Sequence, residues 1–170
     1  RFGNVLASSG SVIPIFERQI KEGKDITITS KEMTRFFMSI PDAVGLVLNA
    51  ARLAHLGEIF ILKMNAMKIA DLAEVLAEEL APRHGKDFRK IRYKIIGMRP
   101  GEKEHEPLFT EGEAAHLSEQ EGMYILHNPL LAEYGIKIPK NKKDFNNYSN
   151  TVSHLSKDEI RKMLYDKKII

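Results

Sequence analysis

Residues 41–62, PDAVGLVLNAARLAHLGEIFIL, decide the fold class of this chain. A helix is predicted over about residues 41–55, because Pro41 suits a first helical turn and Asp42 can cap its start. The helix has almost no polar face, so we expect it to be well buried. The apolar run over residues 58–62 then predicts a strand, and a helix that leads into a strand is typical of α/β proteins.

Short helices and strands alternate on both sides of this unit. The evidence is apolar spacing of three and four residues for helices, spacing of two for strands, and capping or turn residues at their ends. The predicted elements are a helix over residues 12–20 that begins at Ser11 and ends near Gly23, a strand over 26–29, an amphipathic helix over 69–80 ended by Pro82, a strand over 91–96, a hairpin that joins 114–117 to 123–127 across Glu121-Gly122, and a last helix that begins after Ser156.

Composition limits the kind of protein that this can be. The chain has 170 residues, 43% of them hydrophobic, and a net charge of +3 from 26 basic and 23 acidic residues. This balance does not predict a nucleic-acid partner, which usually requires a strongly basic face. The chain has no cysteine, which excludes disulfides and is compatible with a cytoplasmic setting. No apolar run approaches the roughly 20 residues that span a bilayer.

The motif Arg99-Pro100-Gly101-Glu102 is the first candidate binding element. Arginine offers a planar fork of donors that suits phosphate oxygens, and glutamate accepts hydrogen bonds from the hydroxyls of a ribose or sugar. The two residues together suit a nucleotide diphosphate. A plain turn with a solvated ion pair is the alternative, because proline and glycine favour turns.

Arg35 is the second candidate, because it lies among large apolar residues in the run Met33-Thr34-Arg35-Phe36-Phe37-Met38. Burial of an arginine is costly unless the charge has a partner. The partner could be a nearby carboxylate such as Glu32 or Asp42, or it could be the phosphate of a ligand. The residues alone leave both possibilities open.

Other catalytic chemistry has little support. The six histidines lack metal-ligand spacing, so we expect no metal site. The order Gly-x-Ser-x-Gly is absent, and so is a glycine-rich dinucleotide-binding fingerprint. Glu102, Glu104 and Glu106 could be paired catalytic carboxylates, but we expect a solvated first helical turn after Gly101, where acidic residues are favoured.

Four separated blocks resemble one family of enzymes. They are Arg1-Phe2-Gly3-Asn4-Val5-Leu6, Ser9-Gly10-Ser11-Val12-Ile13-Pro14, residues 33–38, and Arg99-Pro100-Gly101-Glu102-Lys103. In this order and spacing they resemble the carboxy-terminal half of CapD-type polysaccharide biosynthesis proteins. These are extended short-chain dehydrogenases that act as inverting UDP-N-acetylglucosamine 4,6-dehydratases or as UDP-sugar epimerases. The resemblance covers residues 1 to about 127.

The resemblance implies a role for each matching residue. Asn4 would touch the diphosphate or the sugar, and Thr27 would meet the uracil through its backbone. Arg35 and Arg99 would clamp the diphosphate, and Glu102 would accept a hydrogen bond from the uridine ribose. A shared anionic ligand would then explain both arginines.

The resemblance also implies that this chain binds the substrate while residues upstream of Arg1 bind the cofactor and carry out catalysis. The fold would be the carboxy-terminal part of a Rossmann-like extended short-chain dehydrogenase, with a small mixed α/β substrate-binding lobe. Residues 1–127 would form the UDP-sugar-binding part with the last Rossmann strands and helices, and residues 128–170 a covering segment with a short helix. The glycine loop that binds NADP and the catalytic Tyr/Lys residues would all lie upstream, so this chain alone would bind no cofactor.

Further expectations concern the whole protein. The sequence starts at Arg1 rather than Met, and we expect it to be part of a longer protein. The whole enzyme would oxidise C4 of the sugar with NADP, remove water across C5 and C6, and return the hydride to C6. The expected partners are a UDP-sugar, the amino-terminal half and a second copy of the protein. The expected location is cytoplasmic, at the cytoplasmic face of a membrane if an upstream anchor exists. A UDP-sugar 4-epimerase and a noncatalytic nucleotide-sugar binding or oligomerisation module are the alternatives.

Overall fold

The structure is a computed structural model that describes residues 1–138 and 154–170. It is a mixed α/β fold with both parallel and antiparallel strand pairs, which confirms the predicted fold class. The strands form three sheets with the orders β1-β3-β5, β2-β6 and β4-β8-β7. The elements are β1 (Asn4–Val5), α1 (Val12–Glu22), β2 (Ile26–Ile28), β3 (Thr34–Met38), α2 (Ile40–Leu53), β4 (Ile59–Leu62), β5 (Asn65–Lys68), α3 (Ile69–Leu80), the 3-10 turns η1 (Pro82–His84) and η2 (Phe88–Lys90), β6 (Tyr93–Ile95), α4 (Glu111–Ala114), β7 (Leu117–Gln120), β8 (Met123–Leu126), the 3-10 helix η3 (Pro129–Tyr134) and α5 (Lys157–Asp166).

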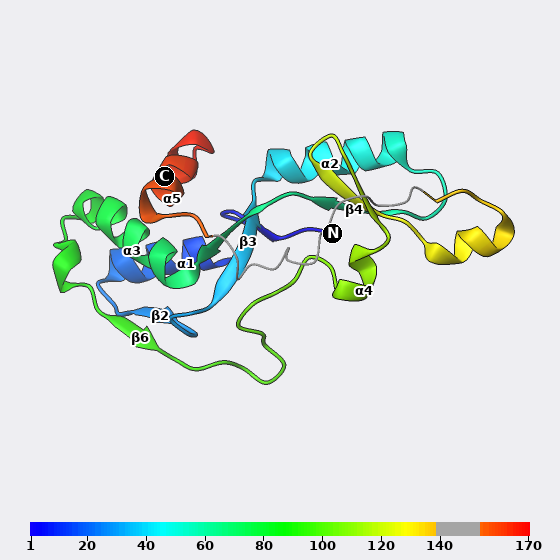
Figure 1. The fold of residues 1–170 in the computed structure, drawn as a ribbon. Coiled ribbons are helices and arrows are strands. Elements are labelled where there is room, and N and C mark those ends of the chain that lie inside the picture. Colours follow the sequence, from blue (N-terminus) through cyan, green and yellow to red (C-terminus); the bar gives the residue numbers. More distant parts are fainter. Residues whose placement is uncertain (139–153) are drawn as a thin grey trace.

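Strand β3 lies between two hydrophobic cores, and all of its residues are buried. Its side chains alternate between the two sides, as in any strand. Phe37 belongs to the core that contains α1, α3 and α5, whereas Phe36 and Met38 belong to the core that contains β4, β7 and β8. Figure 1 shows α1, α3 and α5 gathered at one end of the molecule, with α2 over the other part.

Strand β3 is the middle strand of its sheet, with β1 along one edge and β5 along the other. Strand β1 is parallel to β3 and pairs only with Phe37 and Met38. Strand β5 is antiparallel to β3 on the other side. The sequence analysis did not predict β5, because four residues between a strand and a helix give no clear spacing signal.

The predicted hairpin is confirmed, with its first strand shifted along the chain. β7 and β8 are antiparallel and meet at Glu121 and Gly122, whose φ angles are 49° and 74°. Positive φ at both positions is what a tight two-residue hairpin turn requires. β7 begins only at Leu117, because the preceding residues form α4, which Thr110 and Glu113 cap reciprocally.

Helix α2 forms as predicted but is not well buried, so that expectation is wrong. Ser39 and Asp42 cap it reciprocally, and Leu46 is its one fully buried residue. Its outer face exposes more than half of each apolar side chain, with 51% for Val44, 52% for Val47 and 65% for Leu48. These residues are three and four positions apart and therefore share one face. No element among the described residues covers this outer face of α2.

Helix α5 closes the core around α3. Its start after Ser156 is confirmed, and Ser156 and Glu159 cap it reciprocally. Ile160 and Leu164 are fully buried in the core that contains α3. Arg161 pairs with two acids of α3, Glu78 at 2.6 Å and Glu79 at 2.8 Å. Residues 129–134 of the predicted covering segment form η3, and its residues 139–153 lie outside the described residues.

We predict that Ile160→Ala destabilises the chain by about 2–5 kcal/mol, because it leaves a cavity between α5 and α3. The free energy of unfolding in urea measures this change. Lys162→Ala changes an exposed position of the same helix and is the control, for which we expect little change. Equal stability of both variants would mean that α5 does not contribute to the core.

Candidate functional site

The loop between β6 and α4 carries the Arg99-Pro100-Gly101-Glu102 motif and folds back toward β3 (Figure 1). The motif is a turn in which the Glu102 amide donates to the Arg99 carbonyl at 3.0 Å. Gly101 has a φ of 82°, which a turn with proline second and glycine third requires. The Arg99 amide donates to Glu102 Oε2 at 3.0 Å. Residues 102–106 form no helix, so the expected helical turn is wrong.

The guanidinium of Arg35 is buried against this loop, with 8% of its side chain exposed. Its Nη1 atom donates to the carbonyls of Thr34 at 2.7 Å and Glu104 at 3.0 Å. Two carboxylates face the rest of the group, with Glu102 Oε1 at 3.7 Å from Nη2 and Glu106 Oε1 at 3.5 Å from Nε. The loop therefore surrounds a buried positive charge with acceptors.

The acids suggested from the sequence as partners of Arg35 are paired elsewhere. Glu32 lies 2.7 Å from Lys68, and Asp42 lies 2.9 Å from Lys167. The compensating acids come instead from a loop almost 70 residues further along the chain, which spacing alone cannot reveal.

The two ion pairs of Arg35 are long. A charge-assisted bond between nitrogen and oxygen usually measures about 2.7–2.9 Å, whereas the carboxylates of Glu102 and Glu106 stay at 3.7 and 3.5 Å. The Nε and Nη2 atoms therefore have the geometry to donate to a closer anion that takes the place of these acids. This edge of Arg35 has the geometry that suits a phosphate or carboxylate group.

Further contacts fasten the loop to the segment around β3. The Thr34 amide donates to the Glu104 carbonyl at 3.0 Å. The Thr34 hydroxyl lies 2.8 Å from Nδ1 of His105, and the Ser30 hydroxyl donates to the Glu104 carboxylate at 2.6 Å. The sequence analysis did not identify these residues as part of the site. Its nearest signal was the alternation of acids at positions 102, 104 and 106.

Arg99 lies at the exposed end of the loop. No residue in the described parts of the chain forms a hydrogen bond or an ion pair with its guanidinium. The structure thus brings Arg35 and Glu102 together and places Arg99 in the same turn as Glu102.

Asn4 lies near one of the acids that face Arg35. It lies on β1, opposite Phe37. Together with Glu106 it lines a cavity of about 260 Å³. Glu106 therefore belongs both to the lining of this cavity and to the ion pair with Arg35.

Thr27 lies on β2, one strand away from the loop. Its partner on β6 is Lys94, five residues before Arg99. The side-chain amide of Gln19 bonds to Thr27 twice. It accepts from the Thr27 amide at 3.2 Å and donates to the hydroxyl at 2.8 Å. The backbone donor of Thr27 is therefore occupied in this structure.

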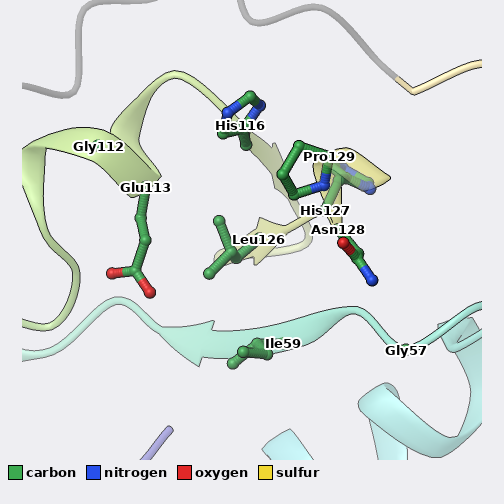
Figure 2. A pocket seen from close by; sticks show the side chains of 9 residues that line it. All are labelled: Gly57, Ile59, Gly112, Glu113, His116, Leu126, His127, Asn128 and Pro129. Atoms are coloured by element: carbon green, nitrogen blue, oxygen red, sulfur yellow. The ribbon is translucent and has the colours of Figure 1, made fainter. Parts of the chain in front are cut away.

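A separate cavity of about 470 Å³ lies beside β4, α4 and the end of β8. Figure 2 shows Glu113, His116 and Asn128 among the side chains that line it. Burial lowers the pKa of His127, whose Nε2 atom lies 2.7 Å from the Ser118 hydroxyl. None of the five predicted site residues lines this cavity.

The Glu113 carboxylate is already paired. It accepts from both terminal nitrogens of Arg1, at 3.0 and 2.5 Å, and from the Thr110 amide at 2.7 Å. The hydrogen bonds from Arg1 are the largest cause that lowers the pKa of Glu113 to about 2.

The described residues contain no group of three histidine or acidic side chains that could hold a metal ion. Within the same residues, no helix has the length and apolar character needed to cross a membrane.

The chain is similar to proteins of polysaccharide biosynthesis. The family described as polysaccharide biosynthesis protein matches residues 1–128. The capsular polysaccharide biosynthesis protein CapD of Staphylococcus aureus is 49% identical over 114 residues, which cover 66% of this chain and 18% of CapD. A UDP-glucose 4-epimerase of Rickettsia akari is 38% identical over 169 residues, which cover 96% of this chain and 48% of the epimerase.

Two further relatives resemble the chain over nearly its whole length. An uncharacterised membrane protein of Methanocaldococcus jannaschii is 49% identical over 164 residues, which cover 96% of this chain and 47% of that protein. The X-ray structure of Pen from Bacillus thuringiensis superimposes with a TM-score of 0.87 at 38% identity and covers 100% of this chain and 49% of Pen. The chain thus spans about half the length of several of its relatives.

We predict that acid removes the stabilising contribution of Glu113. Its folded pKa of about 2 lies below the ordinary value of 4.5, so this contribution is complete above about pH 5 and is lost as the pH falls from there toward 2. Glu113→Gln should lower the free energy of unfolding at neutral pH by on the order of 1–2 kcal/mol, within the range of hydrogen bonds to charged groups. The same substitution should make the free energy of unfolding less dependent on pH between about 5 and 2. Urea unfolding at several pH values measures both effects.

Glu111→Gln at the exposed start of α4 is the matched control. The assignment would be contradicted if Glu113→Gln kept the acid dependence of the parent chain.

Proposed function

The chain belongs to the polysaccharide biosynthesis protein family, and we propose that it is the UDP-sugar-binding portion of a nucleotide-sugar 4,6-dehydratase that acts on UDP-N-acetylglucosamine. The observation that carries this proposal is the buried guanidinium of Arg35, with two long ion pairs, against the loop that presents Arg99 and Glu102. A diphosphate is a ligand whose two charged groups would suit these two arginines.

Each residue of the group has a role in the proposed complex. Arg99 donates to the diphosphate from the exposed side, and Arg35 donates from the buried side through Nε and Nη2. The diphosphate replaces the carboxylate of Glu106, which lies 3.5 Å from Nε. Glu102 then accepts from a ribose hydroxyl. Asn4 faces the sugar or the diphosphate across the cavity that it shares with Glu106.

The uracil is proposed to meet the backbone of Thr27. Gln19 presents to Thr27 a carbonyl acceptor next to an N–H donor. The edge of a uracil carries the same pair of groups. A uracil that takes the place of the Gln19 amide would therefore satisfy the Thr27 amide equally well.

The proposed reaction depends on residues upstream of this chain. A glycine-rich cofactor loop does not occur in residues 1–170, and we propose that an upstream half of the protein binds NADP and carries the catalytic residues. The role of this chain is then to bind and orient the UDP-sugar. A chain of this length alone should bind the ligand without turnover.

A UDP-sugar 4-epimerase is the second candidate, supported by the similarity to the Rickettsia akari enzyme over 96% of this chain. Mass spectrometry of the product from the full-length protein separates the two reactions. A dehydratase converts UDP-N-acetylglucosamine into a product lighter by one water, whereas an epimerase gives an isomer of equal mass. Ligand binding without any product would favour the noncatalytic binding module.

The outer face of α2 is the proposed contact with the upstream half. Val44, Val47 and Leu48 form an apolar stripe on this face, and relatives of the chain are about twice as long. An apolar helix face of this kind is normally buried against another element. Without the upstream half, two copies of the chain would bury it by self-association.

We predict that Arg99→Ala weakens UDP binding by about 1.5–3 kcal/mol, the usual contribution of a hydrogen bond to a charged group. Calorimetric titration with UDP measures the effect, and AMP tests selectivity for uridine. Arg89→Ala, which removes an exposed arginine of η2, is the control and should bind UDP as the parent does. Equal affinity of the Arg99→Ala variant would contradict the proposed clamp.

We further predict that the double substitution Val44→Thr and Leu48→Gln reduces self-association of residues 1–170, because it removes apolar area from the exposed face of α2. Sedimentation velocity at several concentrations measures the association. The matched control replaces two exposed residues of η3, Leu130→Gln and Tyr134→Gln. If the control reduced association as much as the α2 variant, the face of α2 would not be the contact.

A further inference from the structure

The loop between β6 and α4 has few means to hold its shape. Residues 96–107 contain no helix or strand segment, so the position of Arg99 and Glu102 depends on individual contacts. The backbone pairing that joins β6 to β2 ends at Ile96, whose amide donates to the Ile28 carbonyl at 2.9 Å. Beyond that point the loop meets β3 again at Glu104 and His105.

Thr34 is one of two residues of β3 that hold the loop at this point, and Arg35 is the other. Thr34 is fully buried, and its amide donates to the Glu104 carbonyl at 3.0 Å. Its hydroxyl lies 2.8 Å from Nδ1 of His105. One residue of β3 thus fixes two consecutive residues of the loop, through its backbone and through its side chain.

The contact with Thr34 also sets the geometry around Arg35. The Glu104 carbonyl that accepts from the Thr34 amide also accepts from Nη1 of Arg35. Glu102 and Glu106, which flank Glu104 at two residues on either side, face the other nitrogens of Arg35. A shift of residues 104–105 would therefore change the distance between the buried guanidinium and Glu102, and it would move the turn that carries Arg99.

We propose that the hydrogen bond between Thr34 and His105 positions the Arg99–Glu102 turn for nucleotide diphosphate binding. Thr34 and His105 are positioning residues, since neither needs to touch the ligand. This inference rests on the proposed function, because it assumes that the turn binds UDP.

The test compares UDP affinity in variants of the full-length protein by calorimetric titration. Thr34→Val keeps the shape of the side chain and removes the hydroxyl, and His105→Ala removes the partner from the loop without a change in β3. Each should weaken UDP binding by about threefold to tenfold, the range that corresponds to one net hydrogen bond. Thr34→Ser restores the hydroxyl and should bind within about twofold of the parent.

A matched control removes a similar bond elsewhere. The Ser118 hydroxyl lies 2.7 Å from Nε2 of His127, on the sheet formed by β4, β8 and β7. Ser118→Ala therefore removes a hydroxyl–imidazole bond of the same kind and should leave UDP affinity unchanged. Thermal unfolding of every variant shows whether weaker binding comes with a destabilised fold or only with a displaced Arg99–Glu102 turn. If Thr34→Val lowers the unfolding midpoint, His105→Ala decides the outcome.

Arg99→Ala in the same series separates the two proposals. If Arg99→Ala weakens UDP binding but the His105→Ala variant binds as the parent does, the positioning role is wrong and the proposed function stands. If none of these variants changes UDP affinity, the proposed binding site itself is wrong. A loss in Thr34→Val and His105→Ala, with recovery in Thr34→Ser, would support the positioning role.

Discussion

The burial of the Arg35 guanidinium is the constraint on which the rest of this structure depends. A positive charge with so little exposure is costly unless acceptors surround it. Residues of β3 cannot supply carboxylates without losing their own packing, since β3 serves two cores at once. The acids come instead from the loop between β6 and α4, which folds back across the molecule to reach the charge.

This compensation connects the fold to the function that we propose. The same loop that neutralises Arg35 of β3 carries the turn with Arg99, so one segment both contacts the buried charge and presents the exposed one. The carboxylates remain beyond the usual length of a strong ion pair. We propose that a phosphate can take the place of one of these acids at Arg35.

Much of the secondary structure could be predicted from the sequence, because caps, apolar spacing and turn residues are local signals. The start of α2 near Asp42, the start of α5 after Ser156 and the glycine that ends α1 are examples. The burial of α2 could not be predicted, because apolar content does not tell which faces of a helix have partners within the same chain. Residue chemistry alone made Arg35, Arg99 and Glu102 candidates, and the resemblance to the family gave them a shared ligand. The contacts of Glu104 and His105 with β3 join residues about 70 positions apart, and no local pattern reveals such pairs.

The most direct test of the account is a crystal structure of the full-length protein with UDP-N-acetylglucosamine. The account predicts that the diphosphate lies within hydrogen-bonding distance of Arg99 and of Nε or Nη2 of Arg35, with the Glu106 carboxylate moved away from Arg35. A diphosphate bound elsewhere, with the ion pairs of Arg35 to Glu102 and Glu106 unchanged, would contradict it.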